Sequence, residues 1–143
     1  MVRKLLAIVE DLAVILGWAI TVASIMLQAM YKPRYGIVVA SPISLTLLDY
    51  LSLFGASVLS GMILVDAEKV MLGYIASLFT SLLIMFVALI SPSFLGTVKY
   101  SSVEGLLYGG AAALIFQYVF PTAIFVCLAG GVLGGILGEK LHM

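Results

Sequence analysis

Charged residues are scarce in this chain. Only 10% of its 143 residues are Asp, Glu, Lys or Arg, whereas a soluble globular protein has about 25%. Hydrophobic residues make up 64% of the chain. Because a short chain leaves much of its surface exposed, a soluble domain of this size could not bury so much apolar area. The composition therefore predicts an integral membrane protein, in which lipid covers the apolar excess.

Amides are also rare, since asparagine is absent and glutamine occurs only at Gln28 and Gln117. Thermophilic proteins tend to contain few thermolabile amides, so this composition favours the hypothesis of a thermophilic source. Seven basic and seven acidic residues cancel to a net charge of zero. Without a basic excess no field attracts nucleic acid. The expected partners are the lipid bilayer and either further copies of the chain or another membrane subunit.

Side chains that carry chemistry are few. The single cysteine, Cys127, lies in an apolar run, and the single histidine, His142, is the penultimate residue. One cysteine excludes an intrachain disulfide framework, and one terminal histidine is too little for a His-ligated haem or metal site. The motifs H-E-x-x-H, G-x-S-x-G, C-x-x-C and the glycine-rich phosphate loops are missing. We expect no catalytic residue, cofactor or metal, and a chain that is not an enzyme.

Long apolar blocks dominate what is present. A membrane-spanning helix needs about 20 mostly apolar residues, and no block has the alternating pattern of a barrel strand. The sequence predicts an all-α, polytopic transmembrane bundle forming one domain over 1–143, with spans at 12–30, 47–65, 70–90 and 106–137. Residues 1–10 are expected to form an interfacial helix rather than a cleaved signal peptide, because Glu10 and Asp11 interrupt the apolar run.

The last block is long for a single span. As one helix it would extend for roughly 48 Å, whereas the hydrocarbon core is about 30 Å thick. Pro121 lies near its middle and removes a backbone donor. We favour one tilted and kinked helix, giving four spans, because a turn in lipid would leave backbone groups unpaired. The alternative is five spans, with a break at Pro121 between helices at 102–120 and 122–138.

The acidic residues indicate where helices begin. Thr46-x-x-Asp49 and Ser101-x-x-Glu104 fit the capping box, in which a hydroxyl and a carboxylate satisfy free N–H groups at a helix start. Other acids near the block starts would face the positive end of the helix dipole; they are Asp11, Asp66 and Glu68.

The positions of the basic residues give a weak orientation signal. With four spans, the side that holds both termini carries four basic residues and the opposite side three. This bias predicts, by the positive-inside rule, that both termini face the cytoplasm of a cell membrane. The residues concerned are Arg3, Lys4, Lys69 and Lys140 on the first side and Lys32, Arg34 and Lys99 on the other.

Glycines near the C-terminus form the clearest motif. Two parallel rows with a four-residue repeat would flatten one helix face and let another backbone approach closely. The second predicted span offers a similar small face, which includes Ser57 and Gly61. This glycine-zipper pattern predicts helix packing either within one chain or between chains, and sequence does not separate the two. The rows are Gly130, Gly134 and Gly138, with Gly131 and Gly135 beside them.

Two sets of polar residues are candidates for a polar pathway. Pro121 frees the carbonyl of Gln117, and a broken helix with Gln117 and Thr122 near the midplane could coordinate an ion or substrate. The simpler interpretation is that neighbouring groups pair with them. Hydroxyls within the spans usually bond to the backbone one turn back; they are Thr21, Ser24, Ser57, Ser60, Ser77, Thr80 and Ser81.

Three functions are therefore compared. The leading hypothesis is a small non-catalytic membrane protein that acts through helix packing, as a homo-oligomer or as a subunit of a membrane complex. The alternative is a small oligomeric channel or transporter. The third is a membrane-surface enzyme that uses the carboxylates of Asp66 and Glu68.

Overall fold

The structure, a computed structural model, describes residues 1–31, 45–96 and 101–142, and within them every element of regular secondary structure is a helix. This confirms the predicted all-α bundle. Lys32, Arg34 and Lys99, which entered the orientation prediction, lie outside the described residues. The helices are α1 (Val2–Tyr31), α2 (Leu47–Leu64), α3 (Ala67–Phe94), α4 (Ser101–Val119) and α5 (Thr122–His142).

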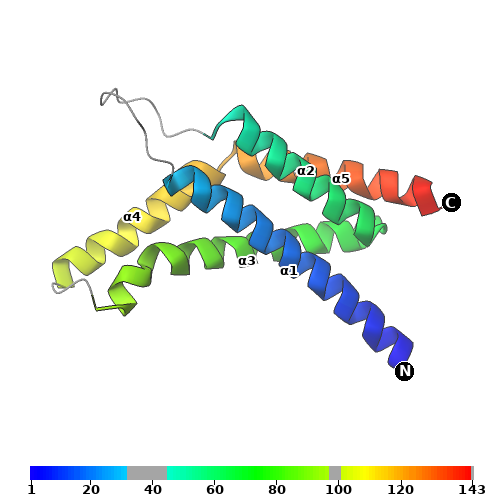
Figure 1. The fold of residues 1–143 in the computed structure, drawn as a ribbon, viewed down its shortest axis with the longest axis horizontal. Coiled ribbons are helices and arrows are strands. Elements are labelled where there is room, and N and C mark those ends of the chain that lie inside the picture. The colour runs from blue at the N-terminus through cyan, green and yellow to red at the C-terminus, as the bar shows by residue number, and fades with distance from the viewer. Residues whose placement is uncertain (32–44, 97–100, 143) are drawn as a thin grey trace.

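Four of these helices, α1, α2, α3 and α5, are long and apolar enough to cross a membrane. Along the long axis of the molecule, α1, α2 and α3 run in alternating directions (Figure 1). The last two helices follow one another in the same general direction (Figure 1), and α5 is the fourth helix of spanning length. The N- and C-termini consequently lie at the same end of the molecule (Figure 1).

The favoured single kinked helix over 106–137 is wrong, because α4 ends at Val119 and α5 begins at Thr122, whereas the four spans expected with it agree with the four helices of spanning length. Pro121 has no N–H to donate to the turn before it, and its ring collides with that turn. Hydrogen bonding resumes at once on both sides: Phe120 N–H donates to the Phe116 carbonyl at 2.9 Å, and Phe125 N–H to that of Pro121 at 3.4 Å. The break at Pro121 agrees with the alternative division of this block.

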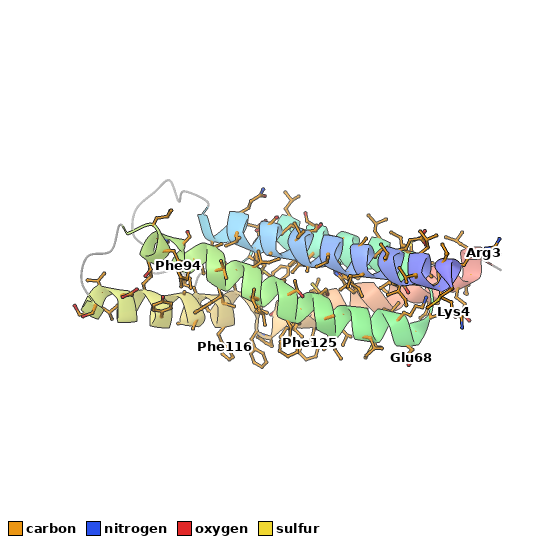
Figure 2. The ribbon with its side chains drawn as sticks, turned by 90° about the horizontal axis from the view of Figure 1, so that it is seen from below. Arg3, Lys4, Glu68, Phe94, Phe116 and Phe125 are labelled. Carbon is orange, nitrogen blue, oxygen red and sulfur yellow. The ribbon has the colours of Figure 1, made fainter. Side chains whose placement is uncertain are left out.

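Four helices form a ring in which each contacts two neighbours. The order around the ring is α1, α2, α5, α3, and the contact between α2 and α5 is the most extensive. In side view α1 and α2 form one layer, and α3 and α5 form the other (Figure 2). The best buried large side chains inside the ring are Trp18, Met26, Leu53 and Met85. Helix α4 lies outside this ring and packs mainly against α3.

The predicted capping box at the start of α2 is confirmed. The Thr46 N–H donates to Asp49 Oδ2 at 2.9 Å, and the Asp49 N–H donates to Thr46 Oγ1 at 3.3 Å. The second box is wrong, because Ser101 is already helical and the Glu104 carboxylate accepts a hydrogen bond of 2.5 Å from the Ser93 hydroxyl instead. This bond ties the start of α4 to the end of α3.

Ion pairs close the end of the bundle where the termini lie. Asp11 does not begin a helix as expected, since α1 starts nine residues earlier at Val2. Its carboxylate instead lies 2.9 Å from the Lys69 ammonium, which is also 3.8 Å from Asp66. Asp66 is the N-cap residue of α3 but makes no side-chain capping bond. These contacts join α1 to the turn between α2 and α3.

Candidate functional site

The row Gly130, Gly134 and Gly138 lies directly against the backbone of α2. A Cβ atom at Gly130 would be 2.8 Å from the Phe54 carbonyl oxygen of α2, and one at Gly138 would be 2.5 Å from that of Met62. A Cβ at Gly134 would overlap the Val58 carbonyl oxygen, which belongs to the turn between them. Side-chain carbons do not approach oxygen so closely, so this contact exists because the three residues have no side chain.

The second glycine row, Gly131 and Gly135, contacts α1 and α3 as well as α2. A Cβ at Gly61 of α2 would overlap the carbonyl of Gly131 and lie 3.0 Å from the nitrogen of Gly135. On the other side of α5, a Cβ at Gly131 would be 3.0 Å from the Trp18 ring, and one at Gly135 would be 3.2 Å from Val70. These two glycines therefore make room for α1 and α3.

All seven residues of the predicted packing interface meet at this one place. Gly130, Gly131, Gly134, Gly135 and Gly138 are buried, and so are Ser57 and Gly61 on α2. The structure thus shows the intrachain form of the glycine prediction. A contact between chains cannot use these glycines unless the monomer opens.

Ser57 adds a polar contact to the α2–α5 interface. Its hydroxyl accepts a hydrogen bond of 3.1 Å from Trp18 Nε1, and Trp18 and Ser57 are 2% and 0% exposed. The Trp18 ring lies 6.2 Å from that of Tyr74, whose hydroxyl donates to the Ile124 carbonyl at 3.0 Å. Polar groups enclosed among apolar helices need such partners, so this cluster fixes how α1, α2, α3 and α5 meet.

The structure does not bring Gln117 and Thr122 together as a polar pathway. Both side chains are exposed on the outside of the molecule. Neither forms a side-chain hydrogen bond with any residue that the structure describes. Gln117 directly follows Phe116, whose ring stacks on that of Phe120 with 5.2 Å between the ring centroids. In the single chain, Gln117 is an amide that faces the surroundings of the bundle.

Most hydroxyl groups within the spans donate to the backbone of their own helix, as predicted. Ser77 and Ser81 are buried and donate to the carbonyls of Tyr74 and Leu78 at 2.9 Å. They line a cavity of about 20 Å³ beside Trp18 and Cys127, which is room for about one water molecule. On the outer faces, Thr21 and Thr80 donate to the carbonyls of Gly17 and Ala76 at 2.8 Å.

The sequence shows small residues at Gly109, Gly110 and 111–113, upstream of the C-terminal glycines, and some of them belong to a third row, on α4, that sequence reasoning did not identify. Every fourth residue of this helix is small or polar, and every member of the row is exposed. A Cβ added at Gly105 or Gly109 would meet nothing within 4 Å. The four-residue spacing is visible in the sequence, but the more regular glycines of the C-terminus draw attention away from it. The row, which we call the α4 face, is Ser101, Gly105, Gly109, Ala113 and Gln117.

Four apolar helices of spanning length, with nearly all charge at the helix ends, define a small multi-pass integral membrane protein. Within the described residues, no group of three or more His, Cys, Asp or Glu side chains is placed to hold a metal ion. No family model, curated protein or solved structure matches the chain.

Proposed function

We propose that this protein is a non-catalytic membrane component that assembles with a second copy of itself through the α4 face. The observation that carries the proposal is the contrast between its two glycine surfaces. The C-terminal rows are filled by α1, α2 and α3, whereas Gly105 and Gly109 have nothing within 4 Å of an added Cβ. Small residues at this spacing allow close helix contact and the dispersion energy that comes with it.

The position of Gln117 supports a protein partner for this face. Its neighbours Phe116 and Phe120 line the same apolar groove as Phe79, which lies near the middle of the spanning helix α3. At that depth an exposed amide would face hydrocarbon, where an unpaired polar group is costly. A second helix on the α4 face would supply the missing hydrogen bonds.

The chemistry of the face favours a second copy over a different protein. None of its five residues is charged, so two copies can meet without repulsion. An amide carries both donors and an acceptor, so Gln117 can pair with its symmetry mate. Copies inserted in the same direction are related by a two-fold axis along the membrane normal, which brings each residue of the row near its own counterpart.

Replacing Gly109 by Leu tests this assembly. We expect the wild-type chain to be dimeric in liposomes by energy transfer between labelled copies, and the variant to lose most of that signal because the added side chain separates the helices. Gly17→Leu is the matched control, since Gly17 of α1 also has nothing within 4 Å of an added Cβ. A monomeric wild-type protein, or equal transfer in both variants, would contradict the proposal.

A channel or transporter is the alternative, formed only when copies surround a shared axis. The structure offers it less support, because the cavity beside Ser77 and Ser81 has a volume of only about 20 Å³. Ion flux into liposomes that changes on Gln117→Leu would favour this alternative. Flux at background level for wild type and variant would leave the packing role as the better account.

A further inference from the structure

A second surface, separate from the α4 face, is an open apolar groove between α3 and the α4–α5 break. Its volume is about 610 Å³, and each of the ten residues that line it is apolar. The wall from α3 runs from Phe79 to Phe86, and the opposite wall includes Ala112, Phe116 and Phe120. The groove exists because α4 departs from the line of α5 at Pro121 (Figure 1).

The groove lies at the depth of lipid tails. Phe79 and Phe86 are in the middle and second half of the spanning helix α3. Their separation of seven residues corresponds to about 10 Å along the helix, which is most of the roughly 15 Å that one leaflet contributes to the hydrocarbon core. At the outer end the Phe86 ring lies 6.2 Å from the half-buried ring of Tyr108. Beyond it the Ser93–Glu104 hydrogen bond begins the polar surface.

The size of the groove distinguishes between its possible occupants. A helix about 10–12 Å wide fills roughly 400–600 Å³ per turn, so a groove of 610 Å³ would hold about one turn of a second helix, far less than a packed helix pair needs. An apolar cavity of about 150 Å³ accommodates benzene. By that measure the groove has room for on the order of 20 carbon atoms, which is the scale of a lipid tail.

We infer that this groove holds the hydrocarbon tail of one membrane lipid, with its headgroup at the α3–α4 end. The inference goes beyond the proposed assembly and does not depend on it, because the groove is lined by Ala112 and Phe116 whereas the α4 face contains Ala113 and Gln117. Phe116 is 66% exposed and points away from the bundle (Figure 2). A bound tail would cover this ring and join α3 to α4, which otherwise touch over a limited area.

The test is to count lipids that stay bound to the full-length protein. The wild type, Ala112→Phe and Ala129→Phe are reconstituted into phosphatidylcholine vesicles, extracted in mild detergent, washed and examined by native mass spectrometry. Ala112→Phe fills the groove. Ala129→Phe places the same ring on an exposed position of α5 that does not line it. We expect one retained lipid per chain in the wild type and in Ala129→Phe, and at least a tenfold loss in Ala112→Phe.

Controls keep this result interpretable. An unchanged Trp18 emission spectrum shows that the bundle of Ala112→Phe is intact. If that variant does not fold, Leu83→Phe blocks the groove from the α3 wall, where Leu83 is 65% exposed. Equal lipid retention in the groove variant and the Ala129→Phe control would overturn the inference.

Discussion

Gly134 is the residue at which the absence of a side chain matters most. A Cβ there would overlap the Val58 carbonyl and also lie 2.9 Å from the Val58 carbonyl carbon and Cα. These are backbone atoms of a helix that is itself packed, so they cannot move aside as a flexible side chain would. The contact joins the backbones of two packed helices, yet one added carbon atom at Gly134 is enough to disturb it.

We therefore expect Gly134→Ala to lower the free energy of unfolding by about 1–3 kcal/mol, the usual cost of overpacking a well-packed interior. The measurement is equilibrium unfolding in mixed detergent micelles with increasing SDS. Gly55→Ala is the matched control on α2, because a Cβ at Gly55 meets nothing within 4 Å. Similar stability of the two variants would mean that the α2–α5 contact is looser than the structure shows.

The hydrogen bond between Trp18 and Ser57 shows how residue-level prediction can succeed in part. The sequence placed Ser57 on a small face but pointed to no partner for it on α1. The two residues are 39 positions apart in the sequence, but Trp18 Nε1 lies 3.1 Å from Ser57 Oγ. No local rule connects them, because the contact requires the indole of α1 to enter the space that Gly131 leaves on α5.

At the scale of helices, Pro121 decides the form of the last pass. The sequence identified the residue and both of its possible consequences, a kinked helix or a break. Contacts of α4 with α3 accompany the break: the Glu104 carboxylate accepts a hydrogen bond from the Ser93 hydroxyl, and the Tyr108 ring lies against that of Phe86. These contacts hold α4 beside α3, while the glycine rows hold α5 beside α2.

Pro121→Ala restores the missing N–H and removes the ring that collides with the preceding turn. We expect the helix to become continuous across residue 121. The distance between spin labels at Leu106 and Leu137, both exposed, should then approach its value in a straight helix. For residues 31 positions apart that value is about 46 Å. Both proteins carry Cys127→Ser so that only the introduced cysteines are labelled.

Thr122→Ala is the control for this experiment, since it changes the adjacent residue without restoring a backbone donor. An unchanged label distance in Pro121→Ala would show that the contacts of α4 with α3 and of α5 with α2 fix the bend without the proline. In that case the sequence signal at Pro121 would be a marker of the break rather than its cause.

For the whole molecule, the arrangement of passes places both termini at one end (Figure 1). The ion pairs of Lys69 with Asp11 and Asp66 lie near this end too. Charges gather there because they remain hydrated outside the hydrocarbon core, where they would be expensive. Four basic residues, Lys69 among them, belong to this end, which by the positive-inside rule favours a cytoplasmic location for it.

We accordingly expect cysteines introduced at Arg3 and Lys140 to behave alike towards a membrane-impermeant maleimide, in a Cys127→Ser background. In right-side-out vesicles both should be protected, whereas a cysteine at Thr46, at the opposite end of α2, should react. Reaction of both terminal cysteines would reverse the orientation and keep the four-pass fold. Reaction of one terminal cysteine alone would contradict the fold itself.

The sequence by itself determined that lipid surrounds this protein, that its fold is helical, and, to within one residue, where α1 ends and where α2 begins and ends. Apolar length, capping residues such as Thr46 and Asp49, and the proline at 121 act locally or through composition, so they can be recognised without knowing what lies nearby. The tertiary structure decided which small faces are used. The C-terminal and α4 rows have the same spacing, but Gly134 is filled by Val58 while Gly109 remains open. That difference depends on which helix lies opposite each row, and only the path of the chain through three dimensions sets it.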